Sequence, residues 1–228
     1  MLVLAADTSG KYGSIALAQC GPGEACEVLE VVPLEGGTFS AQLVPQIAGL
    51  LAKHGFNKKE IGAFAVASGP GSFTGLRVGL AAIKALAEVL HKPIAAVSLL
   101  EAVARAHPAG GKVVAGLDAG RGQIYAGDYE IGETAIVRNE RLLDREEFVE
   151  LARGKVVVSP DRLVLDIALA AGLRVEEIER PRSDAIACLG WQKIQAGETV
   201  SPEALEANYI RRSDAEIFSG SADPARRS

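Results

Sequence analysis

The sequence has few aromatic residues and no excess of positive charge. Of its 228 residues only 5% are Phe, Trp or Tyr, and 29 acidic residues outnumber 24 lysines and arginines, which gives a formal net charge of -5. A chain that binds nucleic acid by itself usually presents a clustered positive surface. The sequence therefore predicts no DNA binding, and predicts that any RNA contact is local or shared with a partner.

Cysteines and long hydrophobic runs are also scarce. Cys20, Cys26 and Cys188 are an odd number without CxxC spacing, which argues against a disulfide framework and a zinc site, so all three are predicted to be reduced, small apolar side chains. No apolar run approaches the roughly 20 residues that span a bilayer. The apolar N-terminal run meets Asp7 before the core of a signal peptide could form. We therefore expect no membrane segment and a cytoplasmic location.

The residues that are present, 48% hydrophobic and 23% charged, are typical of a globular protein with one large domain or two small ones. Hydrophobic periodicity and turn residues predict an α/β protein. Strands are expected at residues 2–6, 14–18, 28–32, 63–67, 94–97, 113–117, 123–129 and 156–158. Helices are expected at residues 41–54, 74–91, 144–152, 161–171 and 184–196.

The two halves of the chain open alike. Each begins with an apolar strand that ends in an aspartate, Asp7 or Asp118, followed by a small-residue turn and a returning strand, and the two aspartates lie 111 positions apart. This predicts an internal duplication, although an apolar run followed by Asp is common enough in α/β proteins to arise twice by chance. We expect an N-terminal lobe at 1–108, a C-terminal lobe at 109–218 and a disordered tail at 219–228.

A glycine-rich turn joins the predicted strand at 63–67 to the next helix. It reads Gly69-Pro70-Gly71-Ser72-Phe73-Thr74-Gly75-Leu76-Arg77. Backbone N–H groups at such a helix start can bind an anion. The glycine spacing is nevertheless one residue longer than the dinucleotide fingerprint, and Leu76-Arg77 replaces the Lys-Ser/Thr of a Walker A loop. The alternative is that the glycines serve backbone geometry and packing, with Ser72 or Thr74 as the helix cap.

The helix behind this turn is unusually apolar. Its charged residues Arg77, Lys84 and Glu88 share one narrow stripe, and nearly all its other residues are apolar or small. A helix that packs on one sheet needs an apolar stripe of only about 100°. Two interpretations remain open: the helix lies between other elements of its own domain, or it also contacts another protein chain.

These motifs resemble those of the bacterial TsaB (YeaZ) family. The nine residues from Gly69 to Arg77 are similar to the family signature, residues 4–9 to its opening strand and turn, residues 118–125 to its second-half DARRGEVY-like stretch, and residues 209–212 to its C-terminal Tyr-Leu-Arg segment. The resemblance covers residues 1–212 and is strongest in the first 130. It implies a duplicated actin/sugar kinase/Hsp70-like (ribonuclease H-like) α/β fold with two small lobes.

The resemblance also implies a function. Members of the family are non-catalytic subunits required for tRNA threonylcarbamoyladenosine modification; they scaffold the catalytic subunit TsaD and the ATPase TsaE, form homodimers when TsaD is absent, and meet tRNA only through the complex. The alternative is an independent small ATPase or kinase that holds magnesium and nucleotide with Asp7 and Asp118. A metallopeptidase is disfavoured because His54, His91 and His107 are isolated in the sequence.

The same resemblance implies the functional residues. It implies no catalytic residue, no metal site and no cofactor bound by this chain alone. ATP or ADP is expected only within the complex. The implied partner-binding residues, on the two N-lobe helices, are Leu43, Ile47, Leu50, Leu76, Leu80, Ile83, Lys84 and Ala87. The motif residues implied for a nucleotide or an interface are Asp7, Thr8, Ser9, Gly69, Gly71, Ser72, Thr74, Gly75, Arg77, Asp118 and Arg121.

Simpler roles remain open for several of these residues. Asp7 is also placed to accept hydrogen bonds from the Thr8 and Ser9 amides of its own turn, and Arg77 and Arg121 are also consistent with ion pairs or solvated surface. The chain departs from the family at residues 38–42 and at Ser159-Pro160-Asp161. Both departures weaken any claim of a nucleotide site in the C-terminal lobe.

Overall fold

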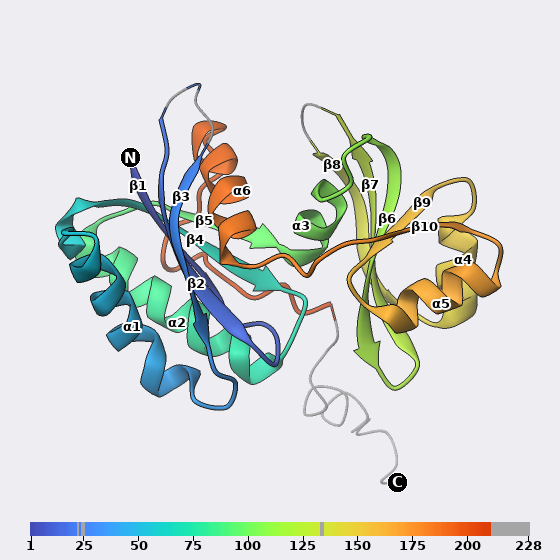
Figure 1. Ribbon diagram of the computed structural model, residues 1–228, viewed down its shortest axis with the longest axis horizontal. Helices are drawn as coiled ribbons and strands as arrows, with labels where there is room; N and C mark the ends of the chain where they lie inside the picture. Colours follow the sequence, from blue (N-terminus) through green and yellow to red (C-terminus); the bar gives the residue numbers. More distant parts are fainter. Residues whose placement is uncertain (22, 24–25, 133–134, 211–228) are drawn as a thin grey trace, which may run out of the picture.

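The computed structural model describes residues 1–21, 23, 26–132 and 135–210. These residues form two lobes, each built on a five-stranded mixed sheet that is flanked by helices (Figure 1). The predicted tail at 219–228 lies outside the described residues. No helix in the described part of the chain is both long enough and apolar enough to cross a membrane.

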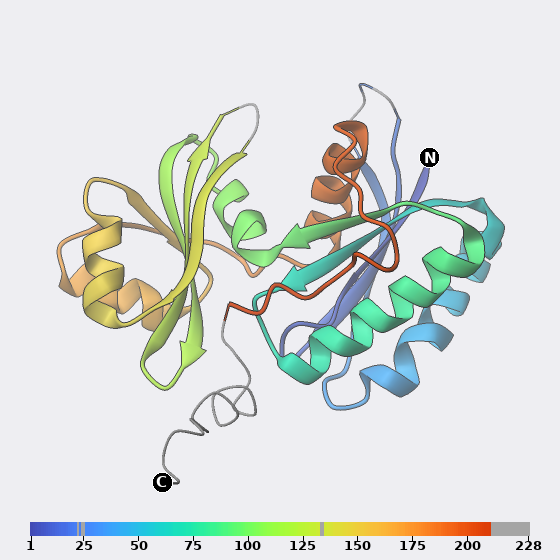
Figure 2. The same ribbon diagram turned by 180° about the vertical axis from the view of Figure 1, so that it is seen from behind.

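The N-terminal sheet has the strand order β3-β2-β1-β4-β5, with β1, β2 and β3 antiparallel and β4 and β5 parallel to β1. Its elements are β1 (Leu2–Asp7), β2 (Gly13–Gln19), β3 (Glu27–Leu34), α1 (Phe39–Lys53), the short 3-10 helix η1 (Lys58–Glu60), β4 (Ile61–Gly69), α2 (Phe73–Leu90) and β5 (Ile94–Ser98). Helices α1 and α2 lie side by side across one face of this sheet (Figure 2). Alternate residues of β1, such as Leu2 and Leu4, point into the core beneath these helices, while Val3 and Ala5 point to the opposite face.

The C-terminal sheet repeats this plan, with the order β10-β9-β6-β7-β8. The remaining elements are α3 (Leu99–Arg105), β6 (Gly111–Gly120), β7 (Gln123–Ile131), β8 (Ala135–Leu143), α4 (Arg145–Ala152), β9 (Val156–Ser159), α5 (Arg162–Ala170), β10 (Arg174–Glu177) and α6 (Ser183–Gln195). Strands β6 to β10 pair in the order in which β1 to β5 pair, and α4 and α5 correspond to α1 and α2. The predicted duplication is therefore confirmed.

The third helix of each half packs on the other half's sheet. Helix α6 covers the face of β1, β2 and β4 opposite α1 and α2, and α3 packs on β6 and β7 (Figure 1). One hydrophobic core consequently runs through both lobes and includes Val103 of α3, Val113 of β6 and Trp191 of α6. The division of the sequence at residue 108 remains a prediction, because α3 and α6 each pack across it.

The cysteines differ from the prediction. Cys20 follows β2 and Cys26 precedes β3, and the two form a disulfide with a Cα–Cα distance of 4.4 Å, so the prediction that all three cysteines are reduced is wrong for this pair. The physical reason is the antiparallel pairing of β2 and β3. Gln19 lies opposite Glu27, so Cys20, which follows Gln19, comes close to Cys26, which precedes Glu27. Cys188 in α6 is a free thiol whose pKa is raised by burial and by the nearby Asp184 carboxylate.

Candidate functional site

The glycine turn connects β4 to α2 and is bonded to the turn that follows β1. The Ser72 hydroxyl caps α2 by accepting a hydrogen bond from the Gly75 amide at 3.3 Å, so Ser72 is the cap and Thr74 lies within the helix. The Ser72 amide donates to the Ser9 carbonyl at 2.6 Å, and the Thr8 hydroxyl donates to the Gly75 carbonyl at 2.7 Å. The backbone amides of Ser72 and Gly75 are therefore already hydrogen-bonded within the chain.

Close packing explains three glycines of α2 and its turn. A Cβ added at Gly75 would lie 2.0 Å from the Thr8 carbonyl oxygen, and one at Gly71 would lie 2.5 Å from the Ser9 carbonyl oxygen. At Gly79 the added Cβ would lie 2.3 Å from the Thr8 hydroxyl oxygen. Gly69 instead has a φ of 122°, a conformation that favours glycine. The structure therefore confirms the alternative that the glycines of this turn serve backbone geometry and packing.

The two strand-ending aspartates have equivalent local bonds. Asp7 is buried, and its Oδ1 accepts hydrogen bonds from the Ser9 amide at 2.9 Å and the Ser9 hydroxyl at 2.6 Å. Burial raises the pKa of the Asp7 carboxyl, while these hydrogen bonds and the charge of Arg180 oppose the rise. Asp118 accepts a hydrogen bond from the Gly120 amide at 2.7 Å. The alternative in which Asp7 bonds its own turn is confirmed for the Ser9 amide.

A cleft of about 1040 Å³ opens between the lobes and brings several motif residues together. The predicted residues that line it are Ser9, Gly71, Ser72, Thr74, Gly75 and Asp118. Arg180 also lines it and forms an ion pair with Asp161, whose other carboxylate oxygen accepts a hydrogen bond from the Asp118 amide at 2.9 Å. The Asp161 and Arg180 side chains are thus paired with each other at the edge of the cleft.

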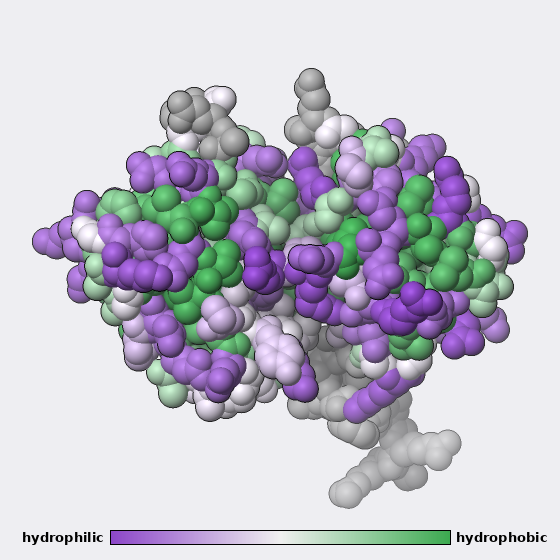
Figure 3. All heavy atoms as spheres, viewed as in Figure 1, coloured by the Kyte–Doolittle hydropathy of each residue, from purple (hydrophilic) through white to green (hydrophobic). Residues whose placement is uncertain are grey.

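A second hollow, of about 500 Å³, lies between α1 and α2. Its lining is mostly apolar or small: Ser40, Leu43, Val44, Phe73, Thr74, Arg77, Val78, Ala81 and Ala82. We call this hollow the α1/α2 groove. In the space-filling view, hydrophobic residues reach the surface in patches among hydrophilic ones on both lobes (Figure 3).

Most of the predicted partner-binding residues lie in the core of the N-terminal lobe. Seven of the eight are buried in the core between the helices and their own sheet: Leu43, Ile47, Leu50, Leu76, Leu80, Ile83 and Ala87. Lys84 is half-buried. The sequence pattern marked the apolar face of each helix without showing that the sheet already covers it. The partner-binding role of these residues remains a prediction; of the seven buried ones, only Leu43 also lines the α1/α2 groove.

Many of the outward residues of α1 and α2 are small or apolar as well. We call them the α1/α2 face: Ala41, Val44, Pro45 and Ala48 of α1, and Phe73, Arg77, Ala81, Ala85 and Val89 of α2, all of which are exposed. Val44 is 52% exposed and Val89 71% exposed. The surplus of apolar residues in α2 is thus divided between its own core and this outward face.

Arg77 belongs to an aromatic cluster at the start of α2. Its guanidinium carbon lies 3.7 Å from the centre of the Phe73 ring, and its Nε donates a hydrogen bond to the Tyr209 hydroxyl at 3.1 Å. The Phe73 and Tyr209 rings are 5.1 Å apart between centroids. Sequence reasoning missed this contact, because nothing in the sequence links residues 132 positions apart. Arg121, the other arginine of the motif residues, has a φ of 58° in the β6–β7 turn.

The C-terminal strap, residues 200–210, runs along the N-terminal lobe and reaches the C-terminal lobe through the Asn208 side chain. The Val200 amide donates to the Ile94 carbonyl at 2.9 Å, and Leu205 is buried in the core under α2. The Asn208 amide donates to the Ser68 carbonyl at 2.7 Å, and its side chain donates to Glu140 at 2.6 Å. The strap thus holds the end of β4, where the glycine turn begins.

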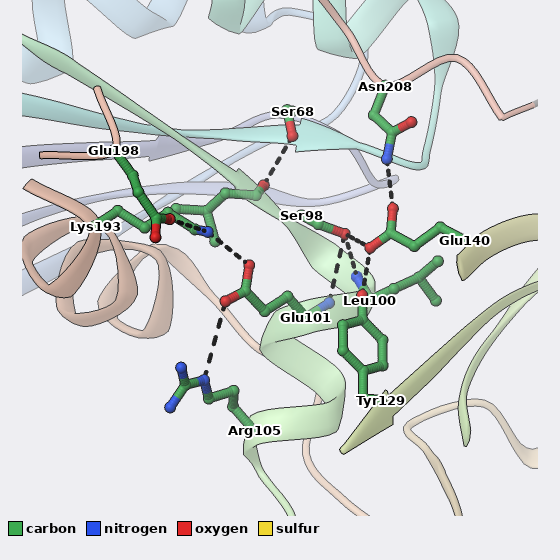
Figure 4. A network of polar contacts seen from close by, with 11 residues as sticks. Ser68, Ser98, Leu100, Glu101, Arg105, Tyr129, Glu140, Lys193, Glu198 and Asn208 are labelled. Carbon is green, nitrogen blue, oxygen red and sulfur yellow. Dashed lines mark hydrogen bonds and ion pairs between the residues drawn. The ribbon is translucent and has the colours of Figure 1, made fainter. Parts of the chain in front are cut away.

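Glu140 is the centre of the polar network that the strap joins (Figure 4). Besides Asn208, the Tyr129 and Ser98 hydroxyls donate hydrogen bonds to its carboxylate. Burial and the Glu140 charge raise the pKa of the Tyr129 hydroxyl, which stays protonated and donates. Residues of β5, β7, β8 and the strap therefore meet at one carboxylate between the lobes.

Two of the three histidines, His54 and His107, are paired with carboxylates. His54 lies 2.8 Å from Glu30, and His107 contacts Glu176. Among residues 1–21, 23, 26–132 and 135–210, no group of three or more His, Cys, Asp or Glu side chains is placed to hold a metal ion.

Comparison with known proteins identifies the family. Residues 31–181 match the family model described as "TsaD: tRNA N6-adenosine threonylcarbamoyltransferase". A Bacillus subtilis (strain 168) protein named tRNA threonylcarbamoyladenosine biosynthesis protein TsaB is 30% identical, over 95% of this chain and 96% of the relative. The Escherichia coli (strain K12) protein of the same name is 28% identical, over 92% and 95% of the two chains.

Two solved structures from Pseudomonas aeruginosa have the same fold. One, an uncharacterised protein with similarity to peptidase YEAZ, has a TM-score of 0.75 and 25% identity over 92% of this chain and 99% of its own. The other, YeaZ, has a TM-score of 0.72 and 22% identity over 91% and 99% of the two chains. The expected actin/sugar kinase/Hsp70-like fold is confirmed. The chain therefore belongs to the TsaB (YeaZ) family, within the larger family that the TsaD model describes.

Proposed function

We propose that this chain is a non-catalytic subunit of the machinery that makes tRNA threonylcarbamoyladenosine, and that it binds the catalytic subunit TsaD through the α1/α2 face. The names of the Bacillus subtilis and Escherichia coli relatives support the pathway. The observation that carries the binding mode is the α1/α2 face itself: two neighbouring helices that turn small and apolar side chains outward beside a groove of about 500 Å³.

The side chains of this face suit helix-to-helix docking. Exposed contiguous apolar surface on a soluble protein often marks an interaction site. Ala81 and Ala85 lie one turn apart on α2, and their small side chains allow a partner helix to approach the backbone closely. Val44 and Val89 add exposed apolar area that docking removes from water, which is worth about 25 cal/mol per Å².

The match to the TsaD model favours a partner of related shape. The matched residues include all of α1 and α2. A TsaD protein is therefore expected to carry a similar pair of helices, and two similar faces can pair around an approximate two-fold axis. A second copy of this chain offers the same surface, which accounts for the homodimer expected when TsaD is absent. TsaE and tRNA would then assemble on the heterodimer.

The bonds inside the interlobe cleft favour a non-catalytic role. A phosphoryl-transfer site uses free carboxylates to hold magnesium and to orient the nucleophile. Here Asp7 is bonded to Ser9, and Asp161 to Arg180 and the Asp118 amide. We therefore propose that the chain has no turnover of its own, with ATP or ADP bound only within the complex.

Aspartate substitutions on the exposed surface test the binding mode. Ala81→Asp places a charge in the groove without disturbing the core, whereas substitution of the buried Leu80 or Ile83 would unfold the lobe. We expect Ala81→Asp to remain a folded monomer that no longer pairs with TsaD, because burying an unpaired charge is costly. The matched control is Ala170→Asp, an exposed alanine on α5, the counterpart of α2. Native mass measurement of co-expressed chains would report the pairing.

Reconstitution of the modification tests the function. If TsaD and TsaE modify tRNA at full rate without this chain, or if Ala81→Asp pairs as well as wild type, the proposal is wrong. An ATP titration tests the rival function, an independent small ATPase that uses the cleft of about 1040 Å³. Tight, magnesium-dependent binding with turnover by the isolated chain would favour that rival.

A further inference from the structure

The last described residues bring the chain to the mouth of the α1/α2 groove. The Tyr209 ring contacts the Phe73 ring at a tilt, and its hydroxyl accepts a hydrogen bond from Arg77; both of these partners line the groove. The buried Leu205 and the Asn208 hydrogen bonds hold this part of the strap in place. Whatever follows Ile210 therefore starts beside an open apolar groove.

The 18 residues that follow have one feature suited to such a groove. They read Arg-Arg-Ser-Asp-Ala-Glu-Ile-Phe-Ser-Gly-Ser-Ala-Asp-Pro-Ala-Arg-Arg-Ser, and their only large apolar side chains are the adjacent Ile217 and Phe218. These two lie eight and nine positions after Tyr209, a distance of up to about 30 Å when the chain is extended. Helix α2, with 18 residues, is about 27 Å long. The apolar pair can therefore reach any part of the groove.

The charges near the groove mouth suit the same segment. Arg77 carries a full positive charge, and its described partners, the Phe73 ring and the Tyr209 hydroxyl, are uncharged. Asp214 and Glu216 lie between Tyr209 and the apolar pair in the sequence. A carboxylate close to Arg77 forms a charge-assisted contact there.

We propose that residues 214–218 occupy the α1/α2 groove of their own chain when no partner is bound, with Ile217 and Phe218 against Val44, Val78 and Ala81. The effect on docking rests on the proposed function, because the groove belongs to the proposed TsaD surface. The segment leaves the groove before TsaD docks, so that the apparent association constant equals the intrinsic one multiplied by the fraction of time that the groove is open.

Nuclear Overhauser contacts in the full chain test the occupancy without a partner. We expect contacts between the Phe218 ring and the methyl groups of Val44 and Val78. The double variant Ile217→Asp/Phe218→Asp should lose them and shift those methyl signals. The matched control, Ala222→Asp/Ala225→Asp, adds the same charge further along the chain and should leave the signals unchanged.

Two results would overturn the occupancy. One is the absence of these contacts, or equal shifts in the variant and its control. The other is contacts seen between differently labelled copies in a mixed sample, which would make a second chain the occupant.

The TsaD affinity of the same variants tests the competition. If the groove is open about a fifth of the time, Ile217→Asp/Phe218→Asp should bind TsaD about fivefold more tightly than wild type, and Ala222→Asp/Ala225→Asp should bind like wild type. Equal affinities would reject the competition. If neither wild type nor variant binds TsaD, the proposed function fails, whereas the contacts within the chain are judged by the resonance experiment alone.

Discussion

At the scale of single residues, glycines decide how closely α2 approaches the turn after β1. The added-Cβ distances at Gly71, Gly75 and Gly79 are all 2.5 Å or less, and each of the atoms met belongs to Thr8 or Ser9. The same two residues exchange hydrogen bonds with Gly75 and Ser72. The glycine motif thus joins a helix start to a strand end, and the positions of its glycines have a packing explanation in this chain.

Substituting Gly75 tests this packing role. We expect Gly75→Ala to lower the free energy of unfolding by about 3 kcal/mol, because its methyl group would meet the Thr8 backbone carbonyl. Gly49→Ala in α1 is the matched control, since a Cβ there meets no atom within 4 Å. It should raise the stability by about 0.5–1 kcal/mol through helix propensity. Urea unfolding measures both changes, and an equal effect of the two substitutions would contradict the packing role.

At the scale of elements, periodic apolar segments were predictable and long-range pairings were not. The expected helices at 41–54, 74–91, 144–152, 161–171 and 184–196 correspond to α1, α2, α4, α5 and α6. The sequence did not predict α3, which is only seven residues long, or the strands β8 and β10. Strand β10, Arg-Val-Glu-Glu, has too little apolar character to be recognised without its partner β9.

The candidate site divides in the same way. Local chemistry, such as the Ser72 cap and the Asp7–Ser9 bond, could be predicted from neighbouring residues. The extent of the outward face of α2 could not, because apolar or small residues cover the helix on both sides of its narrow charged stripe, and only the packing on the sheet distinguishes core from surface. The strap contacts of Leu205 and Tyr209 depend on tertiary structure alone.

The strap gives the prediction at this scale. Leu205 is 3% exposed in the core under α2, so Leu205→Ala should cost about 2–5 kcal/mol of unfolding free energy and should increase hydrogen exchange at the Val200 and Asn208 amides. The control is Leu169→Ala on α5, where the side chain is 48% exposed and the change should stay within about 0.5 kcal/mol. Unchanged exchange at both strap amides would show that Leu205 does not hold the strap.

At the scale of the whole molecule, two lobes share one interior. Helix α3 packs on the C-terminal sheet and helix α6 on the N-terminal sheet. Glu140 accepts hydrogen bonds from Ser98, Tyr129 and Asn208. The core that contains Val103, Val113 and Trp191 has no boundary between the halves. The visible division into two lobes therefore does not imply two independent folding units.

We expect thermal unfolding to be a single cooperative transition. The calorimetric and van't Hoff enthalpies should agree, because neither sheet keeps both faces covered once the other lobe unfolds. Differential scanning calorimetry of the intact chain measures both. Two resolved transitions would instead support independent lobes divided near residue 108.

The crossed helices also bear on how such a chain is assembled from a repeat. Two separate copies of a half-chain would each leave one sheet face bare unless they traded their third helices, as domain-swapped dimers do. Joining the copies in one polypeptide makes that trade intramolecular, so it no longer depends on protein concentration. In this sense the single chain has the architecture of a swapped dimer whose two subunits have been fused.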